Sequence, residues 1–208
     1  MTETNPLIDT ALAAFSRPDL STYRSEVLDD WAKEVRSPDL REAMLANPRL
    51  QNRLAARVSE TAPLPEIDDL AGSPDFPVIA VILTKGAPVL ARAVGLAWHR
   101  STIMAWITWN QLGENLPGVS FEEARASILC VSEKLALENH LPQSPMPKLN
   151  EEDLETFGLA LLDVWLATLP QDLANRVMLF SELAPAKPHA GRAGLVRAIA
   201  QMIISKGT

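Results

Sequence analysis

The chain has 208 residues, enough for one domain or one domain with a smaller lobe, and 47% of them are hydrophobic, as in an ordinary globular protein. Its 26 acidic residues exceed its 19 basic ones and leave a formal net charge of −7, so non-specific attraction to nucleic-acid phosphates is not expected. The single cysteine, Cys130, cannot form an intramolecular disulfide, which fits a reducing compartment. The first residues lack a basic start followed by an apolar run, so we expect no secretory signal there and a cytoplasmic location.

Short helices with proline-marked starts are predicted at the beginning of the chain. Their apolar residues recur at three- and four-residue intervals, the period of one helix face. Ser37 and Asn47 each precede a proline, which is typical of a helix N-cap followed by the first helical position. The predicted ranges are 5–15, 20–35, 38–46 and 48–60. We expect residues 1–60 to form a small N-terminal helical lobe with a charged outer face.

A stretch rich in proline and acidic residues follows at 61–77, and we expect a linker there. It holds Glu66, Asp68 and Asp69, which concentrate negative charge on a short segment. Near its end Ser73 precedes another proline, so the N-cap pattern is repeated and predicts the start of the next helix.

The most apolar part of the chain runs from Pro74 to Gly113 and contains three of the five tryptophans. Charged residues interrupt it, and Gly86 with Pro88 breaks the helix, so it falls short of the roughly 20 apolar residues of a membrane span. Three short buried helices are predicted instead, at 74–84, 87–97 and 100–112. The third has little polar face. Its apolar residues are Ile103, Met104, Trp106, Ile107 and Trp109.

Helix-start signals continue beyond this block. Ser120 and Glu123 form a capping-box pattern that predicts a helix extending to about 139. Asn150 is expected to cap a helix extending to Leu169. Two further helices are predicted at 170–182 and 193–205.

These elements together predict an all-α fold, because no run alternates cleanly between apolar and polar residues. The segment from Val78 to Leu83 is the one place where a strand could occur. We expect a compact multi-helix main domain over residues 78–208.

Residues with catalytic or metal-binding chemistry are scattered along the sequence. The histidines His99, His140 and His189 lie far apart and lack acidic or cysteine partners at ligand spacing. Cys130 is surrounded by apolar helix residues, as a small buried hydrophobe would be. The acidic clusters are explained by helix dipoles and solvated faces. We therefore expect no catalytic, cofactor or metal site, and a protein that is not an enzyme.

A helix-turn-helix interpretation of residues 87–109 is an alternative. The second helix of that motif enters the major groove of DNA with polar side chains on the base edges. The residues there that could read bases are His99, Arg100, Ser101 and Thr102. An apolar recognition helix in an acidic chain argues against DNA binding. We expect Arg92 and Arg100 to pair with a carboxylate or to extend their charged ends toward water.

A series of short motifs then gives a family resemblance. In order they are Gly158-Leu159-Ala160, Trp165-Leu166-Ala167, Pro170-Gln171, Arg176-Val177 and Leu183. Earlier in the chain, an apolar helix is followed by a break at Gly86 and a short helix carrying Arg92. Over about 78–185 this pattern resembles the SctK family, the YscK/PscK group of type III secretion proteins.

The resemblance implies a part of the injectisome sorting platform. Members of the family connect the cytosolic domain of the inner-membrane ring protein, of the SctD type, to the pod built from the SctQ-type protein, and they have no catalytic activity. We therefore expect a cytoplasmic adaptor recruited to the cytosolic face of the inner membrane. No cofactor, no nucleic-acid partner and no direct membrane insertion are expected.

The residues themselves suggest where such an adaptor contacts a partner. Acidic residues concentrate at Glu66, Asp68 and Asp69, so we expect these three to meet a basic partner surface. Another helical protein-interaction module remains open as an alternative function, as do a helix-turn-helix transcription regulator and an enzyme.

Overall fold

Every regular element in the described part of the chain is a helix. The computed structural model describes residues 6–16, 23, 27–28, 37–61, 67–144, 146 and 149–206. In chain order the helices are α1 (Pro6–Ser16), α3 (Pro38–Leu45), α4 (Pro48–Thr61), α5 (Ile67–Gly72), α6 (Phe76–Lys85), α7 (Ala87–Trp98), α8 (Arg100–Thr108), α9 (Leu112–Asn115), α10 (Phe121–Leu129), α11 (Glu133–Glu138), α12 (Glu151–Leu166), α13 (Gln171–Met178) and α14 (Ala190–Lys206). No strand occurs in these residues, and Val78 to Leu83 lies inside α6, so the predicted all-α fold is confirmed.

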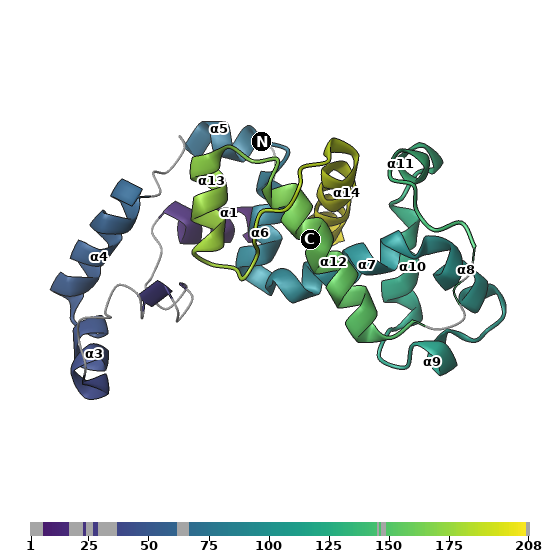
Figure 1. Cartoon of the computed structure of the whole chain (residues 1–208), viewed down its shortest axis with the longest axis horizontal. Helices are drawn as coiled ribbons and strands as arrows, with labels where there is room; N and C mark the ends of the chain where they lie inside the picture. The colour runs from purple at the N-terminus through teal and green to yellow at the C-terminus, as the bar shows by residue number, and fades with distance from the viewer. Residues whose placement is uncertain are drawn as a thin grey trace.

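Helices α7 and α12 lie side by side at the centre of the molecule, and α6 and α14 pack beside them (Figure 1). Two glycines permit the close approach, Gly95 on α7 and Gly158 on α12. A Cβ atom at Gly95 would overlap the backbone of Leu154, and one at Gly158 would overlap the backbone of Ala91. The missing side chains therefore let the two helix backbones come into contact.

The buried side chains form two clusters. The larger joins α1, α6, α7, α12, α13 and α14, and Trp165 is its largest fully buried side chain. The smaller lies under α8, α9 and α10 and contains Trp106, which is only 4% exposed, as the sequence predicted. Helix α12 contributes Trp165 to the first cluster and Leu154 to the second. It therefore connects the main body to the end formed by α8, α9 and α10.

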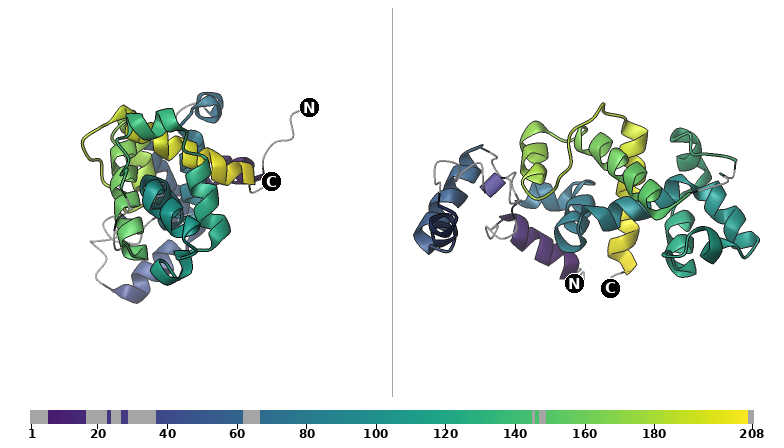
Figure 2. Two further views of the ribbon diagram at one scale, coloured as in Figure 1. Left: turned by 90° about the vertical axis from the view of Figure 1, so that its right-hand side faces the viewer. Right: turned by 60° about the horizontal axis from the view of Figure 1, so that its bottom comes forward.

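Helix α1 belongs to the main body, which differs from the predicted lobe of residues 1–60. Its Ala11 and Phe15 are completely buried in the larger cluster, and α1 packs on α6. The Arg176 guanidinium of α13 donates a hydrogen bond to the Phe15 carbonyl oxygen at 3.0 Å and lies 5.6 Å from the Phe15 ring centre. Helices α3 and α4 instead pack on each other at one end of the molecule (Figure 2).

Two predicted segments lie partly outside the described residues. Three residues of the predicted helix at 20–35 are described, and one of them, Tyr23, is buried with its ring stacked on Phe180 at a centroid distance of 5.2 Å. In the predicted linker at 61–77, residues 62–66 lie outside the described part. The rest of that stretch contains α5 and the start of α6, so it is largely helical rather than irregular.

The single helix predicted from Ser120 to about 139 is wrong, because a break separates α10 from α11. The Ser132 hydroxyl accepts a hydrogen bond from the Leu135 N–H at 3.2 Å, which is the N-cap that starts the second helix. Ser120 does cap α10, accepting from the Glu123 N–H at 3.1 Å. The Glu123 carboxylate, however, pairs with Arg92, so the side chain that would complete the capping box is used elsewhere.

The prediction for the apolar block, Pro74 to Gly113, is also corrected in two details. Ser73 does not cap α6; its hydroxyl accepts from the Asp75 N–H at 3.2 Å, and Asp75 occupies the N-cap position. Met104 is 41% exposed and Trp109 is 60% exposed, so the third predicted helix is not buried all round. Helix α8 ends just before Trp109, and the chain turns at the next residue, Asn110, which has a φ of 56°.

The start of α12 follows the prediction closely. The Asn150 side chain accepts from the Asp153 N–H at 2.7 Å, and the Asp153 carboxylate accepts from the Asn150 N–H at 3.0 Å. This pair is a complete capping box, which the acidic first turn of α12 reinforces through the helix dipole. Across the described residues, none of the helices is both long enough and apolar enough to cross a membrane.

Candidate functional site

A groove lies where the turn between α6 and α7, one face of α12 and the segment after α13 meet. Its volume is about 480 Å³. The apolar residues that line it are Ile82, Ala87, Pro88, Leu159, Phe180 and Leu183. The charged residues that line it are Glu155, Asp163 and Glu182. We call this feature the acidic groove.

The turn between α6 and α7 forms one end of the acidic groove. Gly86 has a φ of 89°, a conformation that favours glycine, and its N–H closes the end of α6 by donating to the Ile82 carbonyl oxygen at 3.0 Å. Pro88 lies in the first turn of α7, where its missing N–H costs nothing. The sequence Gly-Ala-Pro therefore both breaks the apolar block and shapes the groove.

One face of α12 supplies the groove's central stripe. Glu155, Leu159 and Asp163 follow one another at four-residue intervals, so their side chains lie along the same side of the helix. The two carboxylates are about 12 Å apart along the helix axis, from a rise of about 1.5 Å per residue. Leu159 between them adds an apolar surface to the groove.

The segment after α13 forms the opposite wall. The Asp163 carboxylate accepts a hydrogen bond from the Ala184 N–H at 2.9 Å, and the Asp163 carbonyl oxygen accepts from the Ala186 N–H at 3.1 Å. The Ser181 hydroxyl donates to the Val177 carbonyl oxygen at 3.0 Å. These bonds fix the wall against α12 and hold Glu182 at the rim.

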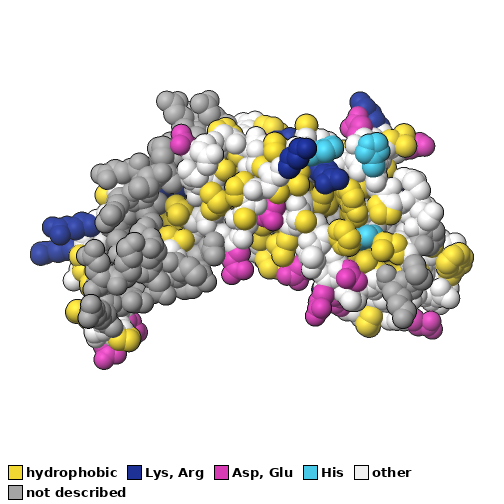
Figure 3. Space-filling view, viewed as in Figure 1, with side chains coloured by type: hydrophobic (Ala, Val, Ile, Leu, Met, Phe, Trp, Pro, Cys, Tyr) yellow, Lys and Arg dark blue, Asp and Glu magenta, His cyan; other side chains and the backbone are white. Residues whose placement is uncertain are grey.

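All the charged side chains among the described residues that line the acidic groove are negative. Among the described residues that line it, none is lysine or arginine, and no described basic side chain forms an ion pair with Glu155, Asp163 or Glu182. Glu182 is exposed, whereas Glu155 and Asp163 are half-buried. Figure 3 shows acidic side chains beside hydrophobic ones across the middle of the face that carries α12 and α13. Such a surface attracts a cationic group attached to an apolar one.

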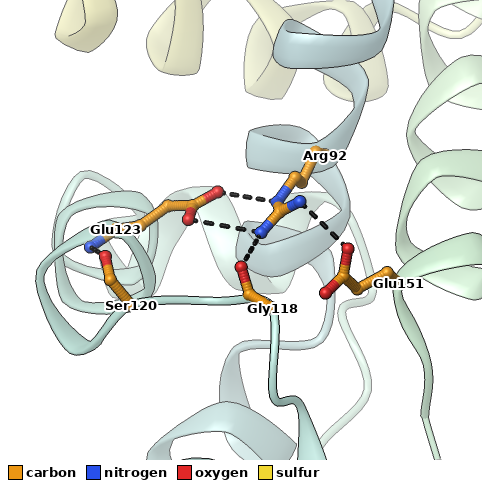
Figure 4. A network of polar contacts seen from close by, with 5 residues as sticks. All are labelled: Arg92, Gly118, Ser120, Glu123 and Glu151. Atoms are coloured by element: carbon orange, nitrogen blue, oxygen red, sulfur yellow. Dashed lines mark hydrogen bonds and ion pairs between the residues drawn. The ribbon is translucent and has the colours of Figure 1, made fainter.

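A second polar cluster lies around Arg92 and has a structural role (Figure 4). Its Nε donates to Glu123 at 2.8 Å, and Nη1 donates to Glu151 at 3.1 Å. Nη2 donates to the Gly118 carbonyl oxygen. A Cβ atom at Gly118 would overlap the Glu151 carboxylate, so a larger residue there would require that side chain to move. The guanidinium therefore ties α7 to α10, α12 and the turn between α9 and α10, and it confirms the expected carboxylate pairing of Arg92.

The predicted partner-binding residues are only partly described. Glu66 lies outside the described residues. Asp68 and Asp69 lie in α5, but their side chains are not among those described. The described lining of the acidic groove does not include them. Their contact with a basic partner stays a prediction.

The histidines and the cysteine do not come together. His99 is buried at 1% exposure with its ring edge against Phe157, and burial lowers the pKa of its imidazole, although the Asp153 carboxylate opposes this shift. Burial raises the pKa of the Cys130 thiol to about 11, so it is protonated at neutral pH and a poor nucleophile. Among the described residues, no group of three or more histidine, cysteine or acidic side chains could hold a metal ion.

The residues proposed for reading DNA bases are buried or half-buried. His99 and Thr102 are buried, and the Thr102 hydroxyl accepts from the Met146 N–H at 3.0 Å. The Ser101 hydroxyl donates to the Pro142 carbonyl oxygen. His99 also has no hydrogen-bond partner among the described residues, but it is buried; Arg100 is therefore the one candidate that is both outside the buried set and without a described partner, which is unfavourable for the helix-turn-helix interpretation.

Sequence reasoning missed the acidic groove, although part of its signal was present. The four-residue spacing of Glu155, Leu159 and Asp163 was visible as one helix face. The contribution of Gly86 and of Glu182 depends on how distant segments pack. No protein-family model, curated protein or solved structure matches the chain.

Proposed function

We propose that the protein is a non-catalytic adaptor and that the acidic groove docks a basic segment of a partner protein. The observation that carries the proposal is the groove itself, in which an apolar floor is bordered by Glu155, Asp163 and Glu182 with no described cation to neutralise them. A partner lysine or arginine supplies the missing charge, and an adjacent apolar side chain covers the floor.

The shape of the groove favours a peptide segment over a small molecule. Its volume of about 480 Å³ would suit either kind of ligand. Its carboxylates, however, are spread about 12 Å along α12, from the helical rise. A chain with two basic residues on one side reaches both Glu155 and Asp163 at once, which a compact ligand does not.

The resemblance to the SctK family gives the adaptor its context. Every described residue of the acidic groove falls between Ile82 and Leu183, inside the region of about 78–185 that resembles that family. On this basis the partners are the SctQ-type pod protein and the cytosolic domain of the SctD-type ring protein. The adaptor works in the cytoplasm at the cytosolic face of the inner membrane, and the basic segment belongs to one of these two proteins.

A pull-down from cells of the protein's own source tests this proposal. The bait is the full chain, either wild type or with Glu155→Lys and Glu182→Lys. The matched control carries Glu114→Lys and Glu133→Lys, two exposed acids on α9 and α11 that change the net charge equally. We expect wild type and control to recover the pod or ring protein and the groove variant to lose it. Recovery of neither protein by folded wild-type bait would reject the sorting-platform proposal.

A further inference from the structure

A second, smaller cavity of about 250 Å³ lies at the start of α8 and shares no lining residue with the acidic groove. Its walls come from α8, from Ala136 of α11 and from residues 141–143. The Ser101 hydroxyl donates to the Pro142 carbonyl oxygen, and the Gln143 side chain donates to the Leu141 carbonyl oxygen at 3.0 Å. The first contact joins Ser101 of α8 to the segment of residues 141–143, so two walls of the cavity are held together by the fold.

Arg100 is the only charged side chain among the described residues that line this cavity. Its Nε atom is buried and has no hydrogen-bond partner among them, and no described carboxylate forms an ion pair with its guanidinium. Two other partly buried arginines do pair with carboxylates: Arg92 meets Glu123 and Glu151, and Arg197 meets Asp75 at 2.6 Å. A buried donor without an acceptor is costly and uncommon in native proteins. Arg100 as a whole is half-buried and lines the cavity, so an acceptor from outside the chain that binds its guanidinium there would offset that cost.

We propose that the Arg100 cavity binds a carboxylate group of a peptide chain. The guanidinium presents N–H groups in a planar fork that matches two carboxylate oxygens. Met104 and Leu141 give the cavity apolar walls for the carbon atoms next to the carboxylate. The volume is below the roughly 300 Å³ at which small-molecule sites begin, which suits one residue of a peptide.

The net charge of −7 argues for one carboxylate rather than a polyanion such as nucleic acid. The carboxylate has two possible sources, the end of a chain or an acidic side chain, and both present the same group to Arg100. This proposal does not depend on the acidic groove, which attracts the opposite charge. A partner that satisfied both sites would carry a basic segment and an acidic or terminal residue.

Titration of the full chain with small carboxylates tests the proposal, followed through the Arg100 Nε–H resonance by NMR. N-acetyl-leucine represents a chain end, N-acetyl-glutamate α-amide represents an acidic side chain, and N-acetyl-leucinamide is the uncharged probe. We expect saturable shifts with a Kd on the order of millimolar for at least one carboxylate and none for the amide. Whichever carboxylate binds more tightly identifies the source.

Variants of the protein distinguish specific carboxylate binding at Arg100 from non-specific electrostatic attraction. Arg100→Gln and Arg100→Lys are each expected to weaken carboxylate binding by about tenfold or more, because lysine keeps the charge but loses the fork. Arg125→Gln, at an exposed arginine of α10, is the matched control and is expected to bind like wild type. Equal binding of the amide, tighter binding of inorganic phosphate, unchanged binding in Arg100→Gln, or no saturable shift with either carboxylate would each overturn the proposal.

Discussion

The Asp163 carboxylate on α12 accepts a hydrogen bond from the backbone N–H of Ala184, with 2.9 Å between Oδ1 and N. The two residues come from separate segments, and their contact places the wall that carries Glu182 beside the helix that carries Glu155. One carboxylate thus both shapes the acidic groove and adds to its charge. Substitutions at Asp163 can therefore distinguish the effect of its hydrogen bond on the groove wall from the effect of its negative charge.

Asp163→Ala is expected to loosen the wall of the groove. It removes the acceptor for the Ala184 N–H, so we expect a loss of about 1–2 kcal/mol in the free energy of unfolding by urea denaturation, together with faster hydrogen exchange at the Ala184 amide. Asp163→Asn is the control, because it keeps an oxygen acceptor and removes the charge. Unchanged exchange at Ala184 in the alanine variant would mean that the bond does not hold the wall.

Gly158→Ala is expected to disturb the central helix pair. Its Cβ atom would overlap the backbone of Ala91 on α7, so the helices must move apart, and we expect a loss of about 1–3 kcal/mol in stability. Gly113→Ala is the matched control, because nothing lies within 4 Å of a Cβ atom at that helical position. Thermal and urea unfolding of both variants provide the comparison. Equal stability of the two would contradict the close α7–α12 contact.

The two tryptophans near the end of α8 are expected to respond differently to truncation. Trp106 is 4% exposed, and Trp106→Ala should cost roughly 3–5 kcal/mol as a buried aromatic deletion. Trp109 is 60% exposed, and Trp109→Ala should change stability by only about 0.5 kcal/mol. Chemical denaturation of each variant measures the difference. A small effect at Trp106 would indicate that the cluster under α8 is a docking surface instead of a core.

His99 is expected to make stability depend on pH. Burial lowers the pKa of its imidazole in the folded state below the usual 6.5, so the unfolded chain binds the proton first as pH falls. The contribution of His99 to stability is therefore complete above about pH 6.5 and decreases as the pH falls below it.

His99→Leu removes the titrating group and keeps an apolar side chain in a site where neither ring nitrogen has a hydrogen-bond partner among the described residues. We expect this variant to lose less stability than wild type between about pH 7.5 and about pH 5.5, as measured by urea denaturation at both values. Parallel losses in the two proteins would show that His99 does not carry the pH dependence.

N-cap residues and apolar periodicity in the sequence predicted most of the helices. The break between α10 and α11 and the exposure of Trp109 were not predicted, because they depend on competing caps and on tertiary packing. Ser37 and Asn150 marked helix starts through hydrogen bonds made within three residues, which the sequence displays directly. Whether the chain continued from α10 into α11 depended on competition between helix propagation and a new cap at Ser132. The exposure of Trp109 depended on where α8 stands in the whole molecule, which periodicity does not encode.

The candidate sites needed the tertiary structure for the same reason. The acidic groove joins Ile82 to Leu183, and the second cavity joins Arg100 to Gln143, so neither is visible within one helix. The spacing of Glu155 and Asp163 on α12 is the one part of the groove that lies within a single helix. The same spacing is equally typical of an ordinary solvent-exposed helix face. The sequence-based choice of Glu66, Asp68 and Asp69 relied on acidic density alone.

The most direct test of the central claim is calorimetric titration of the purified protein with the SctQ-type pod protein and with the SctD-type cytosolic domain, at about 50 mM and about 300 mM salt. We predict that at least one of them binds, that higher salt weakens the binding, and that the Glu155→Lys, Glu182→Lys variant weakens it by about tenfold or more. The Glu114→Lys, Glu133→Lys control should remain within about twofold of wild type. Equal affinity of the groove variant and wild type would contradict the assignment of the acidic groove as the docking site.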